Sequence, residues 1–190
     1  MIRPGDVLDF WLNEVGEEGW YKGGEEIDRK CIEGFGEAWE AARRGGYRNW
    51  LSRPRHALAY MILTDQLPRN IHRGKAASFA TDALALSGAS VAVKCGHDRK
   101  TEGIARQFFY MPFEHAENRQ AQSASVCLFL TRMPEDLSGN IVHARAHREI
   151  IRRFGRFPAR NAALGRATSP AEQRFLDEEG YGGLVKRLQG

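Results

Sequence analysis

Apolar residues recur at helical spacing along almost the whole chain. The clearest case is a run at every fourth position, formed by Ile27, Cys31, Phe35 and Trp39. Residues four apart lie on one face of an α-helix, so this spacing predicts an amphipathic helix with a single buried face. The sequence has no run of alternating apolar and polar residues of the kind that predicts a strand. The pattern therefore predicts an all-α fold.

Turn signals divide this pattern into about eight helices. They are expected near residues 7–15, 27–45, 52–66, 76–94, 101–110, 114–131, 137–154 and 170–179. Pro68 is expected to end or kink the third, because proline lacks the N–H that a helix interior needs. The run from Ser169 to Glu172 is typical of a capping box with proline at the first helical position. For residues 181–190, the sequence allows a loose tail.

The length of 190 residues suits one domain, here taken as residues 1–190, built from stacked antiparallel helix pairs. The apolar runs, such as 126–130, are short for a membrane span, and the N-terminus lacks the apolar centre of a signal peptide. We therefore expect a cytoplasmic protein with no membrane partner. Cys31, Cys95 and Cys127 form no CxxC motif, which favours buried, reduced thiols.

Positive charge is concentrated in one stretch of a chain whose net charge is +4. Between residues 143 and 166 there is one acid, Glu149, and there are seven arginines: Arg145, Arg148, Arg152, Arg153, Arg156, Arg160 and Arg166. Such a stretch favours an anionic partner. Phenylalanines beside prolines more often pin a loop than stack on bases, so a small anionic ligand is a better expectation than nucleic acid.

Two short segments combine proline with an Arg-Asn pair, namely 68–70 and 158–161. Arginine presents a fork of donors that suits carboxylate or phosphate. The two turns are expected to meet and to form one polar site. The ligand-binding candidates are Gln66, Arg69, Asn70, Arg73, Arg153, Arg156, Arg160 and Asn161. The alternative is a structural clasp, in which Asp65 orients Arg69 from one helical turn away.

A dense polar cluster, Glu114-His115-Ala116-Glu117, follows an apolar run and is a candidate for proton transfer. A carboxylate beside an imidazole selects its tautomer, which suits a general acid or base. The catalytic candidates are His115, Glu114, Glu117, His147 and Asp65. The alternative is that the two glutamates only favour the positive end of a helix.

His143 and His147 form an HxxxH pair, which places both rings on one helix face. The residue after His143 is alanine, whereas a zinc protease needs glutamate there. No phosphate-binding glycine loop or dinucleotide fingerprint is present. We therefore expect neither a metal nor a cofactor, and His147 is also compatible with a partly buried, hydrogen-bonded histidine.

Several of these motifs occur together in one known family. They are Val7-Leu8-Asp9-Phe10-Trp11, Leu63 to Asn70 with Arg73-Gly74, Met111 to Glu117, His147, Arg153 to Pro158 and Arg160-Asn161. In this order they resemble the bacterial domain-of-unknown-function family 924. The resemblance implies a tetratricopeptide-like helical fold and no established activity. Ala116 stands where the family usually has serine, and Ala159 where it often has histidine.

The expected function is that of an uncharacterised bacterial protein with an Arg- and His-lined pocket between helices. The pocket would bind a small anionic ligand. If the protein is an enzyme, the same pocket would carry out acid/base catalysis. The alternative is a tetratricopeptide-like interaction scaffold in which the polar motifs serve as clasps. Whether the protein is an enzyme, and its oligomeric state, are left open by the sequence.

Overall fold

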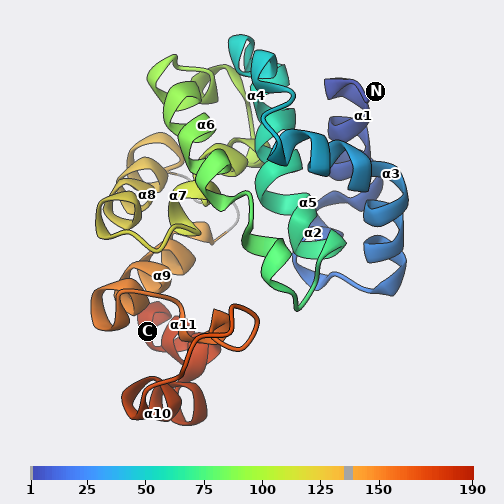
Figure 1. The fold of residues 1–190 in the computed structure, drawn as a ribbon. Helices are drawn as coiled ribbons and strands as arrows, with labels where there is room; N and C mark the ends of the chain where they lie inside the picture. The colour runs from blue at the N-terminus through green and yellow to red at the C-terminus, as the bar shows by residue number, and fades with distance from the viewer. Residues whose placement is uncertain (1, 135–138) are drawn as a thin grey trace. The chain divides into compact units, whose positions relative to one another are not determined.

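The computed structural model describes residues 2–134 and 139–190, and this part of the chain contains helices and turns without any strand (Figure 1). The all-α prediction is confirmed. The chain divides into two compact units, residues 1–112 and 113–190. The expectation of one domain over 1–190 stays a prediction.

The first unit is built from α-helices joined by short 3-10 and π segments. Its elements are α1 (Pro4–Leu8), η1 (Asp9–Val15), α2 (Gly16–Lys22), α3 (Glu25–Arg43), η2 (Arg48–Ser52), α4 (Pro54–Met61), η3 (Ile62–Gln66), α5 (Leu67–Ile71), η4 (Ala76–Phe79), α6 (Asp82–Lys94), η5 (Asp98–Lys100) and η6 (Ile104–Phe109). Helix α7 (Met111–Glu114) spans the division between the units.

The four-residue spacing predicted helix α3 correctly. Cys31, Phe35 and Trp39 are buried on one face of this helix, which packs against α5. Burial raises the pKa of the Cys31 thiol to about 12, so this thiol stays protonated at neutral pH. Cys95 and Cys127 are exposed, and the expectation of three buried thiols is wrong for these two. Cys95 follows the last residue of α6, where the buried face of that helix has ended.

Pro68 does not stop the third predicted helix. The chain passes from α4 through the π-helical turn η3 directly into α5, which carries Pro68 in its first turn. Backbone N–H groups in a first turn have no partner within their own helix, so proline is tolerated there. The change to π-helical hydrogen bonding therefore lets the chain remain helical across the proline.

A close helix contact in this unit lies at Gly88 on α6. A Cβ atom on this residue would lie 2.8 Å from Met61 Cε and 3.0 Å from Tyr60 Cε1, both on α4. The absence of a side chain at this position therefore lets α6 approach α4.

Residues 76–94 are long and apolar enough, by length and composition, to cross a membrane, and a third of their most apolar window is buried. The prediction from short apolar runs such as 126–130 did not identify this longer segment. Core helices of soluble proteins pass the same test, so it is weak evidence for a membrane span.

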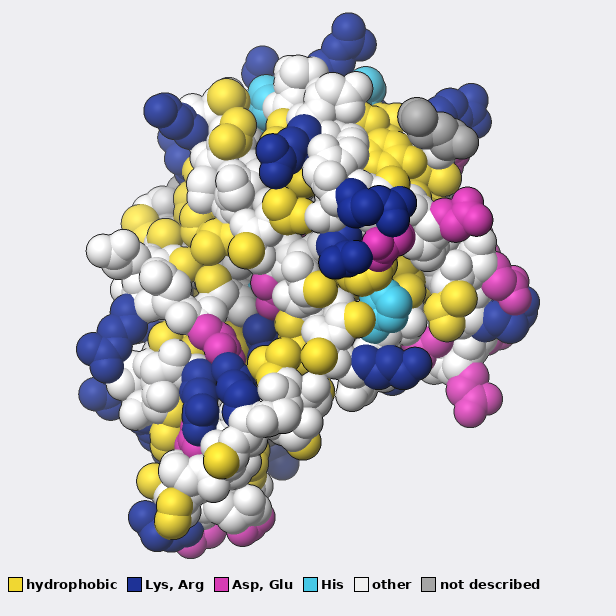
Figure 2. Space-filling model, in the orientation of Figure 1, with side chains coloured by type: hydrophobic (Ala, Val, Ile, Leu, Met, Phe, Trp, Pro, Cys, Tyr) yellow, Lys and Arg dark blue, Asp and Glu magenta, His cyan; other side chains and the backbone are white. Residues whose placement is uncertain are grey.

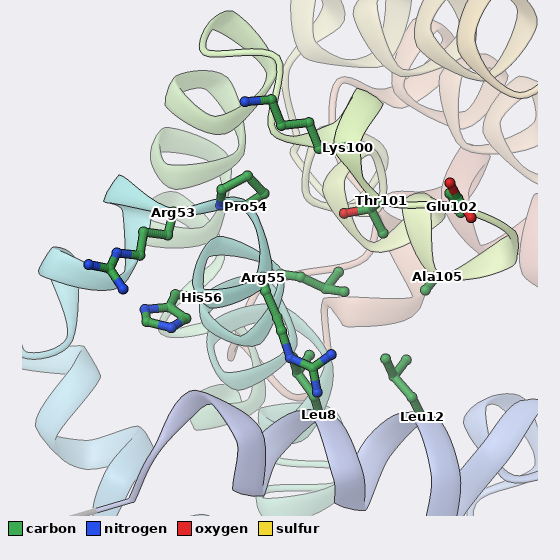
Figure 3. A pocket seen from close by; sticks show the side chains of 11 residues that line it. Leu8, Leu12, Arg53, Pro54, Arg55, His56, Lys100, Thr101, Glu102 and Ala105 are labelled. Carbon is green, nitrogen blue, oxygen red and sulfur yellow. The ribbon is translucent and has the colours of Figure 1, made fainter.

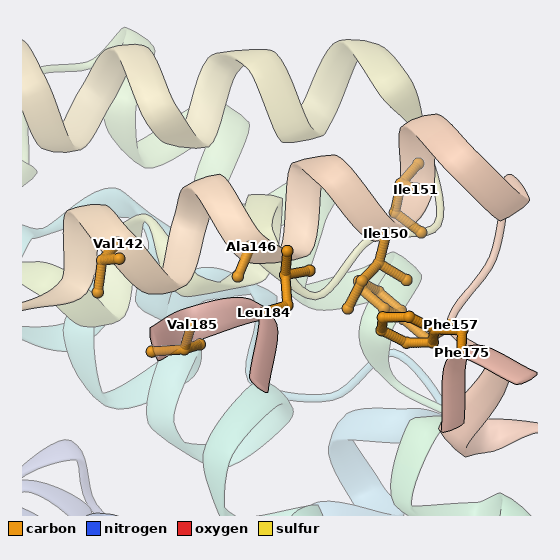
Figure 4. Close-up of a cluster of buried hydrophobic side chains, with 8 residues drawn as sticks. All are labelled: Val142, Ala146, Ile150, Ile151, Phe157, Phe175, Leu184 and Val185. Atoms are coloured by element: carbon orange, nitrogen blue, oxygen red, sulfur yellow. The ribbon is translucent and has the colours of Figure 1, made fainter. Parts of the chain in front are cut away.

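The second unit consists of α8 (Arg119–Arg132), α9 (Asn140–Phe154), η7 (Pro158–Arg160), α10 (Pro170–Glu178) and α11 (Gly180–Gln189). Side chains of α9, α10 and α11 form its buried cluster, which Figure 4 shows together with Phe157. Leu184 of α11 is fully buried in it. Residues 180–189 are thus a packed helix, which differs from the loose tail that the sequence allowed. The expected start of α9 at Leu137 lies outside the described residues.

Side-chain caps begin two helices of this unit. Asn118 accepts a hydrogen bond from the backbone of Ala121 at the start of α8. Ser169 and Glu172 form the predicted capping box at the start of α10. Each cap satisfies backbone N–H groups that the helix itself leaves without partners.

Candidate functional site

The predicted site residues form two groups, one in each unit. Asp65, Gln66, Arg69, Asn70 and Arg73 belong to the first unit, and the remaining candidates to the second. The two Arg-Asn turns are therefore in different units, and their meeting stays a prediction. Each group has its own set of contacts.

Arg69 is held by acids and an aromatic ring of its own unit. Its Nη2 lies 2.6 Å from Asp82 Oδ1 and 3.8 Å from Asp65 Oδ1. Its Nη1 donates to the backbone carbonyl of Ser78, and its guanidinium lies over the ring of Phe79 at 4.9 Å. The shorter of the two ion pairs is made with Asp82, which sequence spacing did not identify.

Asp65 and Gln66 are both buried, at 0% and 5% exposure. Gln66 Nε2 lies 2.6 Å from Asp65 Oδ2 and 3.7 Å from Met111 Sδ. Both side chains are therefore engaged inside the first unit.

Arg73 ties α5 to α3. It binds both carboxylate oxygens of Asp28, at 2.6 and 2.7 Å, and the amide oxygen of Asn70 at 2.7 Å. These contacts have the form of a structural clasp.

Several arginines of the second unit are also paired with acids. Arg153 pairs with Glu149 at 2.7 Å and with Glu179 at 2.9 Å. Hydrogen bonds from Arg152 and then Arg153 lower the pKa of Glu149 to about 2. On the face drawn in Figure 2, Lys and Arg side chains (dark blue) are interspersed with Asp and Glu (magenta).

Arg156 joins the loop after α9 to the start of α10. It donates to Glu172 at 2.6 and 2.8 Å and to the carbonyl of Ala167 at 2.8 Å. This contact is the main reason that the pKa of Glu172 is lowered to about 2. Arg156 is thus engaged twice within its own unit.

Glu117 pairs with Arg166, with oxygen to nitrogen distances of 2.7 and 2.9 Å, and accepts a hydrogen bond from the backbone N–H of Phe157 at 2.8 Å. Burial acts to raise the pKa of Glu117, but the bonds from Arg166 and Phe157 outweigh it and leave the pKa below its ordinary value. Arg166 also donates to Asn161 Oδ1 at 3.0 Å. Glu117 and Asn161 therefore hold the Arg-rich loop, residues 155–169 between α9 and α10, in place.

Glu114 and His147 form the tightest pair of predicted residues in this unit. Oε1 of Glu114, on α7, lies 2.6 Å from Nδ1 of His147, on α9. The same nitrogen lies 3.0 Å from the carbonyl oxygen of His143. Glu114 is 3% exposed, whereas the His147 side chain keeps 18% of its surface exposed. A buried carboxylate thus supports a partly accessible imidazole.

The two neighbours of His147 Nδ1 identify its tautomer. A carbonyl oxygen only accepts hydrogen bonds, and the carboxylate oxygen is an acceptor as well when ionised. Nδ1 therefore carries the hydrogen, an assignment that follows from its partners. In the neutral ring the lone pair then lies on Nε2, for which the described residues provide no hydrogen-bond partner. Nε2 is the nitrogen available to a ligand.

Other polar atoms surround Glu114. Gln122, on α8, donates to the carbonyl oxygens of Glu114 at 2.5 Å and Ala116 at 2.8 Å. Within the described part of the chain, three buried side-chain atoms of α7 and α8 lack a hydrogen-bond partner: Glu114 Oε2, Gln122 Oε1 and, three residues further along α8, Ser125 Oγ. Buried polar atoms are usually satisfied, so these three require an explanation. Ser125 was not identified from the sequence, because a serine within a helix has no local signal.

Aromatic rings enclose the other faces of His147. Its ring centroid lies 5.0 Å from Tyr181, 5.3 Å from Phe157 and 6.2 Å from His115. The guanidinium of Arg160 lies over the Phe157 ring, 4.5 Å from its centroid. Tyr181 was assigned to a loose tail by the sequence, so its place beside His147 was missed.

The family model described as bacterial protein of unknown function (DUF924) matches residues 7–180. The chain belongs to the DUF924 family. It is also similar to the solved structure of the protein of unknown function ATU0120 from Agrobacterium tumefaciens, with 39% sequence identity and a TM-score of 0.85. That match covers 92% of this chain and 97% of the other. No curated protein matches the chain.

Membership of DUF924 identifies the chain as an uncharacterised protein and assigns it no chemistry, and the tetratricopeptide-like classification stays a prediction. Among the residues described for this DUF924 chain, no group of three or more His, Cys, Asp or Glu side chains is arranged to hold a metal ion. His143 Nδ1 lies 2.6 Å from the hydroxyl of Tyr181, and His147 Nδ1 is occupied as described. In this conformation the HxxxH pair contributes hydrogen bonds through both Nδ1 atoms.

Proposed function

We propose that the Glu114–His147 pair of this DUF924 protein is a proton-transfer site that acts on a small anionic substrate. The observation that carries this proposal is the 2.6 Å contact between a buried carboxylate and the Nδ1 of a partly exposed imidazole. Such a contact orients the ring and stabilises the imidazolium that forms when Nε2 takes a proton. Glu114 acts here as a positioning residue, and His147 as the general base.

Arg160 is the proposed anion-binding group, and it is chosen for its position. Its guanidinium lies 4.5 Å from the ring centroid of Phe157, and the imidazole of His147 lies 5.3 Å from the same centroid. His115 lies near His147 as well, with its ring centroid at 6.2 Å. An anion held by Arg160 would therefore be close to the proposed base.

The other candidate arginines are better explained by structural roles. Arg69, Arg73, Arg153 and Arg156 each have a carboxylate partner within 2.9 Å. Each of these pairs joins separate turns or helices of one unit or neighbouring turns of one helix. We therefore leave them out of the proposed binding group.

The second candidate function is an interaction scaffold in which the polar motifs only clasp helix ends. The pairing of Arg69, Arg73 and Arg156 with acids of their own unit favours it. It differs from the first candidate in one respect: it requires no ligand at His147 Nε2. An experiment on His147 and Arg160 therefore separates the two.

The test is a thermal-shift screen of small carboxylates and organic phosphates, followed by ¹H NMR of each stabilising compound incubated with the protein. We expect at least one compound to raise the melting temperature of the wild type, since ligands that bind the folded state stabilise it. Arg160→Ala should abolish that rise, and Arg145→Ala, an exposed arginine of α9, should leave it unchanged.

For a compound that is also converted, His147→Gln should slow turnover by about 10²–10⁴-fold, the usual contribution of a general acid or base. Glu114→Gln should slow it as well, because the ring of His147 loses the carboxylate that orients it. If no anion stabilises the wild type, or if Arg160→Ala and His147→Gln both behave as the wild type, the proposal is wrong and the scaffold is favoured.

A further inference from the structure

A cavity of about 530 Å³ lies in the first unit, and its lining includes none of the residues predicted as a site (Figure 3). Its lining comes from α1, η1, the start of α4, the residues at and after η5, and η6. The lining residues are Leu8, Leu12, Arg53, Pro54, Arg55, His56, Leu58, Lys100, Thr101, Glu102 and Ala105. A volume of this size falls in the range of small-molecule sites.

The lining combines an apolar part with a cationic part. Leu8 and Leu58 are nearly fully buried, and Leu12 and Ala105 extend the apolar surface. Figure 3 shows Arg55 extending from α4 towards Leu8. A ligand in this cavity would therefore contact alkyl side chains and a guanidinium at the same time.

The cations of the lining lack acidic partners. Within the described residues, the exposed side chains of Arg53, Arg55 and Lys100 make no ion pair or hydrogen bond, although Glu102 belongs to the same lining. Arg69 and Arg73, in the same unit, are both paired with aspartates at 2.6 Å. In Figure 3 the charged ends of Arg53 and Lys100 point away from the other lining residues, whereas the guanidinium of Arg55 is directed towards Leu8. Arg55 is therefore the cation that would meet an anion in this cavity.

Backbone groups add to this preference. Helix α4 begins at Pro54 without a side-chain cap from Arg53. Its first turn therefore leaves N–H groups without partners, at the end of the helix that carries partial positive charge. These groups belong to residues that line the cavity.

We propose that this cavity binds an amphiphilic carboxylate, with the carboxylate at Arg55 and the start of α4 and the alkyl chain against Leu8, Leu12, Leu58 and Ala105. The charge selects an anion, and the apolar lining selects an alkyl chain over a fully polar phosphate or a nucleic acid. This inference does not rest on the proposed role of His147, which belongs to the other unit.

The test is isothermal titration calorimetry of the full chain with octanoate, with acetate and octanol as probes that lack the chain or the charge. We expect octanoate to bind at least about tenfold more tightly than either probe. Octanol lacks the charge-assisted hydrogen bond, which contributes about that factor in affinity, and acetate lacks the alkyl chain. Arg55→Gln should weaken octanoate binding by about the same factor. Arg99→Gln, an exposed arginine outside the lining, should leave it unchanged.

Ala105→Phe, which fills the apolar part, should abolish octanoate binding, with the circular dichroism spectrum as the control for folding. His147→Gln should bind octanoate like the wild type, which separates this site from the proposed proton-transfer site. Equal affinity for octanol and octanoate, or binding unaffected by Arg55→Gln, would overturn the proposal. Binding to phosphatidylglycerol vesicles without binding to free octanoate would overturn it too, and would identify a membrane-surface patch instead.

Discussion

Arg156 and Glu172 face each other through two hydrogen bonds of 2.6 and 2.8 Å, which join the loop after α9 to the first turn of α10. The same carboxylate accepts the backbone N–H of Ser169, so it closes the capping box of α10 as well. One acidic side chain therefore anchors the loop and starts the next helix. Several measurable properties of the second unit depend on such shared acids.

Acid should destabilise the protein through Glu172. Its pKa is lowered from 4.5 to about 2, chiefly by Arg156, so its contribution is present above pH 4.5 and is lost as the pH falls towards 2. Arg156→Ala should lower the free energy of unfolding at pH 7 and flatten its decline between about pH 5 and 3. Urea unfolding at several pH values measures both. Arg174→Ala, an exposed position on α10, is the control and should keep the wild-type pH profile.

Removing Glu117 should loosen the Arg-rich loop. Glu117→Ala takes away both bonds to Arg166 and the acceptor of the Phe157 N–H, and we expect a loss of about 1–3 kcal/mol in stability. A double-mutant cycle with Arg166→Ala measures the coupling. The exposed Glu178→Ala should change stability by less than about 0.5 kcal/mol. A coupling energy near zero would show that Glu117 and Arg166 act independently.

A side chain at Gly88 should destabilise the contact between α6 and α4, because Met61 and the ring of Tyr60 would have to shift. Gly88→Ala places a Cβ 2.8 Å from Met61 Cε and 3.0 Å from Tyr60 Cε1, so we expect a loss of about 1–3 kcal/mol from overpacking. Gly34, inside α3, has no atom within 4 Å of an added Cβ. Gly34→Ala should therefore stabilise the protein by up to about 1 kcal/mol through helix propensity. If the contact is as described, thermal or urea unfolding should show changes of opposite sign in the free energy of unfolding for Gly88→Ala and Gly34→Ala.

The C-terminal helix should contribute to the core. Leu184 is fully buried in the cluster with Ile150 and Phe175, and Leu184→Ala should cost about 2–5 kcal/mol. Gln189→Ala, at the exposed end of α11, should cost less than about 0.5 kcal/mol. Similar small effects for both variants would mean that α11 does not pack as a core helix.

Most helices could be predicted from the sequence, because their spacing and caps are local signals. The face of α3 and the capping box at Ser169 follow directly from residue order. Pro68 was harder, because its effect depends on the hydrogen-bond register of the preceding π-helical turn, which no single residue reveals. α11 was harder still, since Gly182 and Gly183 weaken the helical pattern and only packing against α9 compensates for them.

The sequence identified the individual residues of the site but not which of them contact each other. Glu114 and His147 were both candidates, but their 2.6 Å contact joins α7 to α9 and has no signature in local spacing. Arg69 illustrates the same limit, because its partner Asp82 lies beyond the reach of a helical-spacing rule. The cavity at Arg55 was missed entirely, since its lining comes from separate segments of the chain.

The pairing of arginines within the second unit has a consequence for how the protein meets charged molecules in solution. A guanidinium and a carboxylate a few ångströms apart behave together as a dipole. The electric field of such a pair decays faster with distance than the field of a lone cation. Arg153, Arg156 and Arg166 therefore add little to long-range attraction, despite their density in the sequence. Unmatched cations such as Arg55 and Lys100 supply more of it, so the rate of encounter with anions should follow those residues and fall as salt is added.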